Sequence, residues 1–315
     1  MLIRKATRVV RDFTCDSRRW AAYKPRAGDV IIATAPKVGT TWMQQIVSLL
    51  IFQSAEPRPL GETSPWIDCR FRGPVAQMLD SIEAQTHRRF LKSHLPLDAL
   101  PIYDEVRYIH VARDGRDACM SLMNHYTSFS QQALEGFDKI GLSDETINRP
   151  FPRTPKTERE FFLYWIASRE DETTPAMADN FLRLERAFWR ERRRANLLLV
   201  HYNDLKADLS GEMKRVGEFL EIKTPESLWP QLVEAASFEA MKRDGGRLMP
   251  QVERLLVDGH QNFFYKGTNS RWREVLRDAD LDLYKHRVEA ELSPSLIRWL
   301  RDGRLVTGDP RTFAD

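Results

Sequence analysis

The stretch that decides the fold is Asp29-Val-Ile-Ile-Ala-Thr-Ala-Pro-Lys-Val-Gly-Thr-Thr-Trp-Met-Gln-Gln-Ile-Val47. Its apolar, β-branched run at 30–32 is typical of a buried parallel strand. Pro36 cannot donate to a sheet ladder, and Gly39 tolerates tight backbone geometry, so a loop follows the strand. From Trp42 onward, apolar residues recur at helical spacing. The stretch therefore predicts a strand, a short loop and a helix.

The loop carries groups that suit a phosphate-sized anion. The ammonium of Lys37, the hydroxyls of Thr40 and Thr41, and the free N–H groups at the helix start would converge on one point. The alternative is an ordinary strand–turn–helix with a surface lysine. The loop is not a standard Walker A motif, because Lys37 precedes Gly39 and residues 33–36 supply no first glycine.

Length and composition indicate one globular unit. The 315 residues, 42% hydrophobic and 30% charged, fit a single α/β domain over 1–315 with a sizeable core. Lys+Arg minus Asp+Glu is 48 − 45 = +3, too little to predict a nucleic-acid partner from bulk charge. An Arg-rich helix is predicted at 181–194, and we interpret it as a solvated face. No acidic cluster predicts a metal.

The cysteines and the apolar runs bear on the compartment. Cys15, Cys69 and Cys119 are widely spaced and odd in number, which favours a reducing compartment over a disulfide framework. The basic segment 1–11 has no apolar core typical of a secretory signal. No run reaches the length that crosses a bilayer. We therefore predict a cytoplasmic protein with no membrane partner.

Other segments complete the expected α/β pattern. Residues 1–28 are predicted to be a helical or irregular lead-in. Glycines and prolines predict mobile loops at 136–158 and 242–262. Apolar runs that end in polar residues predict strands at 89–94, 108–112 and 196–201. Together these patterns predict a central, mostly parallel sheet flanked by helices.

Two of these strand ends carry groups that could act on a ligand. His94 stands at the carboxyl end of one strand, where open α/β sheets bind ligands, although a lone histidine is more often structural. Arg113 follows another strand, and Ser121 lies two turns into the next helix. An arginine fork and a hydroxyl can hold a phosphate. The alternative is a surface arginine paired with Asp114 or Asp117.

These stretches together resemble the cytosolic sulfotransferase family, over about residues 29–272. The resemblance is most specific in Pro-Lys-Val-Gly-Thr-Thr-Trp at 36–42, followed by Lys-Ser-His-Leu-Pro at 92–96 and by residues 108–126. It implies the family's P-loop-like α/β fold. It also implies transfer of a sulfuryl group from 3′-phosphoadenosine-5′-phosphosulfate (PAPS), with adenosine 3′,5′-bisphosphate (PAP) as product and no metal.

The resemblance also implies roles for individual residues. His94 would be the general base, and Lys37 and Lys92 would stabilise the transferring group. The residues that it implies for the nucleotide are Lys37, Val38, Gly39, Thr40, Thr41, Trp42, Arg113, Ser121, Tyr202, Phe238, Tyr265, Lys266 and Gly267. The chain departs from the family twice: Val38 replaces a serine, and Tyr265 replaces an arginine whose contact Arg247 or Arg271 could supply. The family's dimerisation motif is not recognisable after Trp272, so the oligomeric state is not predicted.

The acceptor is the least determined partner. Trp66, Phe71, Phe129, Phe151 and Trp165 are candidate walls of an apolar pocket, and each could equally belong to the core. Aromatic walls suit a small, largely apolar alcohol or phenol. Two alternative functions stay open from the sequence: a P-loop kinase acting on a small molecule, and an inactive nucleotide-binding relative.

Overall fold

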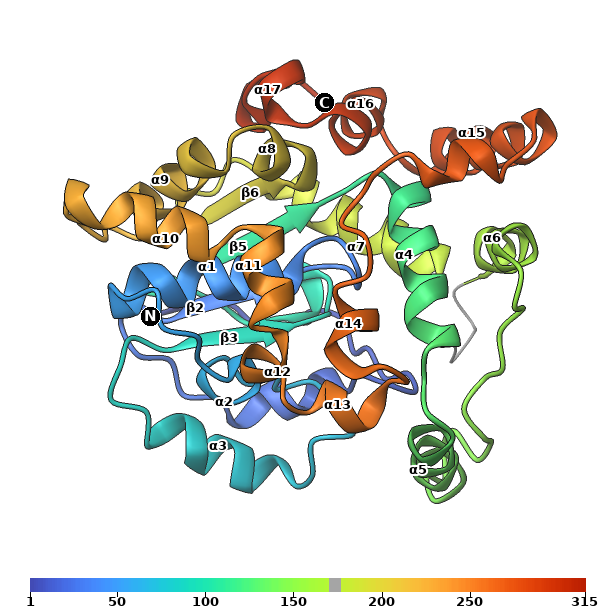
Figure 1. The fold of residues 1–315 in the computed structure, drawn as a ribbon, viewed down its shortest axis with the longest axis horizontal. Coiled ribbons are helices and arrows are strands. Elements are labelled where there is room, and N and C mark those ends of the chain that lie inside the picture. Colours follow the sequence, from blue (N-terminus) through green and yellow to red (C-terminus); the bar gives the residue numbers. More distant parts are fainter. Residues whose placement is uncertain (170–176) are drawn as a thin grey trace.

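A computed structural model describes residues 1–169 and 177–315, and it contains a four-stranded parallel sheet in the order β3-β2-β5-β6 (Figure 1). A two-stranded antiparallel sheet pairs β1 with β4. The strands are β1 (Leu2–Arg4), β2 (Val30–Ala33), β3 (Phe90–Ser93), β4 (Ile102–Tyr103), β5 (Arg107–Ala112) and β6 (Leu197–His201).

Helices connect and cover these strands. The longer helices are α1 (Thr40–Phe52), α3 (Val75–Glu83), α4 (Gly115–Thr127), α5 (Gln131–Leu142), α6 (Glu158–Ala167), α7 (Ala178–Arg190), α9 (Leu209–Phe219), α15 (Asp278–Glu291) and α16 (Pro294–Asp302). The shorter ones are α2 (Leu60–Thr63), α8 (Tyr202–Ala207), α10 (Trp229–Ala235), α11 (Phe238–Arg243), α12 (Gly245–Leu248), α13 (Val252–Leu255), α14 (Gly259–Phe263) and α17 (Arg304–Thr307). Five 3-10 turns complete the described part, at Ser17–Ala22, Leu97–Ala99, Glu226–Leu228, Arg271–Glu274 and Pro310–Thr312.

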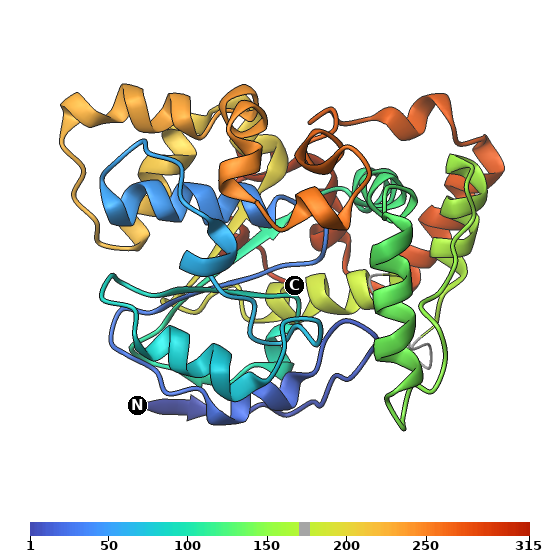
Figure 2. The same cartoon turned by 60° about the horizontal axis from the view of Figure 1, so that its bottom comes forward.

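The predicted strand and helix of the opening stretch are confirmed. All four residues of β2 are buried, and β2 pairs in parallel with both β3 and β5, Ile31 facing Leu91 and Tyr108. Helix α1 covers one face of the sheet and α7 the other, as two views show (Figures 1 and 2). Because the four strands are parallel, their carboxyl ends share one edge of the sheet.

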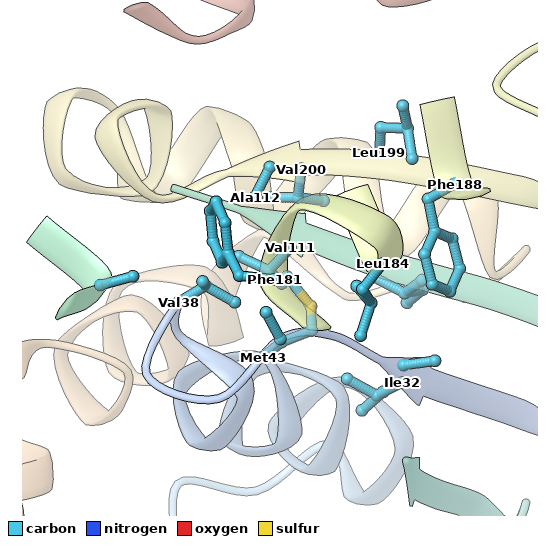
Figure 3. Packing of buried hydrophobic residues seen from close by; sticks show 14 of the residues in the cluster. Ile32, Val38, Met43, Val111, Ala112, Phe181, Leu184, Phe188, Leu199 and Val200 are labelled. Atoms are coloured by element: carbon cyan, nitrogen blue, oxygen red, sulfur yellow. The ribbon is translucent and has the colours of Figure 1, made fainter. Parts of the chain in front are cut away.

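One large apolar core fills both sides of the sheet. Figure 3 shows its centre, where α7 meets the strands and the loop after β2. The labelled members are Ile32, Val38, Met43, Val111, Ala112, Phe181, Leu184, Phe188, Leu199 and Val200. At about 25 cal/mol for each Å² of apolar surface removed from water, this burial is the main stabilising contribution to the fold.

A buried ion pair precedes β2 and joins it to β3. Arg89 bonds Asp29 through two nitrogens, one of them Nε at 2.9 Å from Oδ1, and the two side chains are only 1% and 2% exposed. The Tyr23 hydroxyl also donates to Asp29, at 2.5 Å. A buried pair of this kind is stable only while both partners are present.

Several sequence-based expectations are wrong in detail. The lead-in contains strand β1, and the loop predicted at 136–158 begins only after α5 ends at Leu142. Gly141 is part of helix α5. A Cβ at this position would lie 2.3 Å from both the Arg149 carbonyl oxygen and the Phe13 ring. The residue is therefore a glycine because other atoms approach it closely, and not because the chain turns there. Residues 242–262 likewise form parts of four short helices, α11 to α14, instead of a loop.

The interpretation of the Arg-rich segment 181–194 as a solvated helix face also needs correction. Helix α7 ends at Arg190, and the neighbouring Arg192 is buried rather than solvated, donating to the carbonyl oxygens of Trp189 and Pro310. The three cysteines are free and buried. Among the helices of the described residues, none combines the length and apolar character needed to cross a bilayer.

Candidate active site

The carboxyl ends of all four parallel strands open into one cavity of about 310 Å³. Each strand is followed by a residue or loop that lines it: Lys37 after β2, His94 after β3, Arg113 after β5 and Tyr202 after β6. A ligand edge of this kind was predicted from the residues that follow β2, β3 and β5. The cavity therefore gathers groups that lie more than 160 residues apart in the chain.

The loop after β2 is shaped to present Lys37. The φ angle of Lys37 is 68°, in the left-handed region. This backbone conformation is uncommon for a residue with a side chain and is found more often at functional sites. Gly39 has φ 116°, and a Cβ there would lie 3.1 Å from the Tyr202 ring. Gly39 is also the N-cap of α1 and provides no side-chain cap, so the first-turn N–H groups remain available to an anion.

Two lysines bring unpaired charge to the cavity. Lys37 lies with Nζ 4.8 Å from the centre of the Phe263 ring, and Lys92 lies with Nζ 4.2 Å from that of Trp66. In the part of the chain that the structure describes, neither lysine forms an ion pair with a carboxylate, although the charge of Asp68 acts on Lys92. Burial lowers the pKa of each ammonium to about 8, and the value for Lys37 includes a smaller contribution from the charge of Arg113. An anion bound between the two lysines would favour their charged forms and raise both pKa values again.

His94 is held as a neutral ring with one free nitrogen. Its Nδ1 lies 2.7 Å from the Thr34 carbonyl oxygen, which can only accept, so Nδ1 carries the proton. Its Nε2 has no hydrogen-bond partner among the described residues, which leaves that lone pair available. Burial, with the nearby Lys92 charge, lowers the pKa of His94 well below 6.5. The site thus presents an unprotonated base at neutral pH.

Asp68 fixes the surroundings of this base. It is fully buried, and its carboxylate accepts the indole N–H of Trp66 at 2.7 Å and the backbone N–H of His94 at 3.1 Å. The Trp66 ring meets the His94 ring edge-on, with centres 4.8 Å apart. Asp68 therefore positions both rings, and the sequence analysis did not identify it.

Arg113 joins two loops instead of standing free. Its guanidinium lies over the Tyr202 ring at 4.0 Å and is 5% exposed as a residue. Four hydrogen bonds run from it to the carbonyl oxygens of Lys37 and Thr268 and to Oδ1 of Asn269. These bonds use most of the five N–H donors of an arginine. The surface pairing with Asp114 or Asp117 is therefore not what occupies it.

The aromatic residues assigned to the nucleotide lie together. Trp42 meets Tyr202 edge-on at 5.4 Å, and its indole N–H donates to the Ala236 carbonyl at 2.7 Å. Phe238 packs against Gly267, where φ is 63° and a Cβ would lie 2.7 Å from the ring. Only glycine fits both this backbone and this contact. All three aromatic residues predicted for the nucleotide in this group therefore line the cavity.

Three other residues predicted for the nucleotide also line the cavity. Ser121, Tyr265 and Lys266 line the cavity, and Tyr265 and Lys266 are exposed. Of the two arginines that could replace the family's missing one, Arg271 lines the cavity. Arg247 instead lies 3.9 Å from Glu56, outside the cavity lining given by the described residues.

The predicted acceptor walls divide into two groups. Trp66, Phe71, Phe129 and Phe151 line the cavity, whereas Trp165 is 1% exposed and packs in the core with its ring 5.9 Å from that of Phe181. Trp165 is therefore removed from the candidate pocket.

Val38 also differs from the expectation. Its side chain is fully buried, and Figure 3 shows it in the core cluster with Phe181 and Met43. Its side chain does not line the cavity formed by the described residues, although its neighbours Lys37 and Gly39 do. The substitution of valine for serine places an apolar group beneath the loop.

Besides Asp68, the sequence-based predictions also did not include Thr34, Phe137, His125 and Phe263. Thr34 accepts from His94 through its carbonyl, and its hydroxyl lies 2.5 Å from that of Thr40, so it links the base to the anion loop. His125 and Phe137 line the cavity from the consecutive helices α4 and α5, and Phe263 lines it from α14. For these residues the sequence indicated only that some of them are apolar, and apolar character does not distinguish a residue that lines a cavity from one in the core. No group of three metal-ligating side chains occurs in residues 1–169 and 177–315.

Known proteins resemble this chain over most of its length. The family described as "Sulfotransferase domain" matches residues 27–294. A glycolipid sulfotransferase of Mycobacterium tuberculosis is 31% identical over 310 residues, 94% of each chain. Sulfotransferase 1C2 of Homo sapiens is 24% identical over 280 residues, covering 85% of this chain and 86% of the relative. Mouse sulfotransferase SULT7A1, solved as a complex with PAP, has a TM-score of 0.65 at 17% identity and covers 90% of each chain.

Proposed function

The chain belongs to the sulfotransferase family, and from that premise we propose that it moves the sulfuryl group of PAPS to a hydroxyl of a small, largely apolar alcohol or phenol. One observation carries the proposal. Within residues 1–169 and 177–315, a neutral histidine with a free Nε2 shares a cavity with two lysines that form no ion pair with a carboxylate, beside the uncapped start of a helix. The site therefore offers a base and an anion-binding region together.

The donor fits the cavity by its chemistry. PAPS has a 5′-phosphosulfate and a 3′-phosphate joined by adenosine. Lys37, Thr40, Thr41 and the first-turn N–H groups of α1 would hold the 5′ end. Arg113, Ser121 and Lys266, with Arg271 in place of the family arginine, would hold the 3′-phosphate. The adenine would lie among Trp42, Tyr202 and Phe238.

The transfer step follows from these positions. Nε2 of His94 takes the proton of the acceptor hydroxyl, and the oxygen forms a bond to sulfur. The bond between sulfur and the bridging oxygen breaks, which leaves the electron pair on the 5′-phosphate of PAP. Negative charge grows on that bridging oxygen in the transition state. Lys37 and Lys92 stabilise this charge strongly because their surroundings are largely free of water.

The acceptor end supports an apolar substrate. Trp66, Phe71, Phe129 and Phe151 line the cavity, joined by Phe137. A glycolipid is a second candidate, because the Mycobacterium tuberculosis relative carries that name and the cavity wall also includes the polar Asp12 and Thr14. Membership of the sulfotransferase family excludes the kinase alternative. We also propose a cytoplasmic location.

A transfer assay tests the proposal. The protein is incubated with PAPS and a panel of phenols, apolar alcohols and a glycolipid, and sulfated product and PAP are quantified by mass spectrometry. We expect PAP and one sulfated product in equal amounts, with a chelator present or absent, because the lysines supply the stabilising charge. If PAP binds but no acceptor is sulfated, the chain is an inactive relative. If ATP with magnesium yields a phosphorylated acceptor, the assignment of reaction class is wrong.

A further inference from the structure

His125 differs from every other histidine in the chain. It lies on α4, lines the cavity, and packs against Phe129 and Phe263 with ring centres 5.0 and 6.1 Å away. The sequence contains seven histidines, and in the described residues His125 is the one that makes no hydrogen bond. The others bond Arg88 (His87), Thr34 (His94), Ala33 and Glu185 (His110), Leu300 and Asn203 (His201), Glu253 (His260) and Asp282 (His286).

Neither ring nitrogen of His125 has a hydrogen-bond partner among the described residues. Its Nδ1 is buried without a partner. Its Nε2 is not among the buried unpartnered atoms, so this nitrogen reaches the open cavity. Burial lowers the pKa of His125 well below 6.5, helped by the charges of Lys37 and Lys92. The ring is therefore neutral, with one nitrogen able to donate a hydrogen bond and the other able to accept one.

Packing alone does not account for a histidine at this position. A phenyl ring would make the same contacts with Phe129 and Phe263 without burying the polar Nδ1, which has no partner among the described residues. A state in which a buried polar group lacks its hydrogen bond is less populated by roughly 5- to 150-fold. Because Nε2 opens into the cavity, a ligand bound there can supply a hydrogen bond to the ring at that nitrogen.

We propose that His125 is a specificity residue that hydrogen-bonds a second hydroxyl of the acceptor, apart from the hydroxyl that His94 deprotonates. The inference rests on the proposed function and narrows its acceptor class to apolar molecules with two separated hydroxyls. A hydroxyl suits this ring because it both donates and accepts, so either tautomer finds its complement. The aromatic residues around His125 would contact the apolar part of such a molecule.

Matched acceptor pairs test the inference. Each pair is a 4-alkylphenol and its counterpart with a hydroxyl at the chain end, over chain lengths of two to six carbons. Binding to the PAP complex is measured by calorimetry, and kcat/KM for sulfation is measured in parallel. The variants are His125→Phe, which keeps the ring contacts, and His125→Gln, which keeps a donor and an acceptor. His286→Phe is the control, because that exposed ring bonds only its own helix.

The wild type and His286→Phe are expected to bind the hydroxylated member at least about tenfold more tightly at one chain length. His125→Phe should abolish that preference while binding the plain alkylphenol equally well or better, and His125→Gln should restore part of it. Equal weakening of both members by His125→Phe, or an unchanged preference, would overturn the inference. So would the absence of a preference in the wild type. Because binding is measured without turnover, the inference can fail while transfer succeeds, and transfer can fail while the preference holds.

Discussion

The lowered pKa of Lys37 makes nucleotide binding depend on pH. In the free protein, burial and the Arg113 charge hold this pKa at about 8. A phosphate bound at the loop favours the charged ammonium and raises the pKa. Binding therefore takes up protons near pH 8, and PAP affinity is fully developed below this pH and falls above it. PAP contributes little to this dependence, since a phosphate monoester is ionised above its second pKa of about 6.

The size of the effect follows from the titration of one group. With a pKa of about 8, roughly 0.9 of the Lys37 side chains are charged at pH 7, 0.5 at pH 8 and 0.1 at pH 9. If only the charged form binds PAP, affinity falls about tenfold between pH 7 and 9, and binding at pH 8 takes up about 0.5 proton at this residue. Lys92, whose pKa is also about 8, adds to the total.

Lys37→Arg isolates the contribution of Lys37. The guanidinium stays charged at every accessible pH. PAP binding to the variant should therefore take up about 0.5 proton less at pH 8, and most of the pH dependence of affinity that Lys37 causes should disappear. Uptake is measured by calorimetry in two buffers of different ionisation enthalpy, between pH 7 and 9. Lys24→Arg, at an exposed position, is the control. Identical proton uptake by Lys37→Arg and the wild type would refute the reasoning.

Two further predictions concern the supporting structure. Gly267→Ala should weaken PAP binding by roughly tenfold in calorimetry, because φ is 63° and the new Cβ would push on Phe238; left-handed backbone alone costs a residue with a side chain about 1–2 kcal/mol. Gly136→Ala is its control, since nothing lies within 4 Å of that Cβ, and equal affinities of the two variants would contradict the expectation. Asp29→Ala should lower the free energy of unfolding by about 3–5 kcal/mol in urea, because it removes the buried carboxylate and leaves the buried Arg89 only the exposed Glu83 as an ion-pair partner. A loss below about 1 kcal/mol would show that the pair contributes little to stability.

The sequence predicted the parts of the fold that rest on local patterns. Strands β2, β3, β5 and β6 each follow from an apolar run with a polar end. Short elements escaped the same reasoning. β1 has three residues and is defined by its pairing with β4, about 100 residues away. The glycines in α5 and α12 suggested loops, but Gly141 and Gly245 permit close contact with Phe13 and His260.

Within the site, residue type was predictable and side-chain direction was not. Lys37, His94 and Arg113 follow strands whose carboxyl ends meet, so their positions in the sequence were enough to expect a shared cavity. Val38 faces the core because the loop turns at Lys37, and a backbone angle of this kind has no sequence pattern. Trp165 is one of four aromatic residues in α6, and packing places its ring in the core beside Phe181 of α7, as it also buries Phe161 and Phe162. No periodic pattern in the sequence indicated that His125 faces the cavity.

The most direct test of the account is sulfate transfer by His94→Ala. With PAPS and an acceptor that the wild type sulfates, we expect the variant to lose about 10²- to 10⁴-fold in kcat, the contribution of a general base. Its affinity for PAP should stay within about threefold of the wild type, because the His94 ring bonds the Thr34 carbonyl and is not one of the groups proposed to hold the phosphates. The wild-type rate should also stay level as the pH falls through 6.5, since the pKa of His94 lies well below that value. Normal turnover by His94→Ala would contradict the central claim.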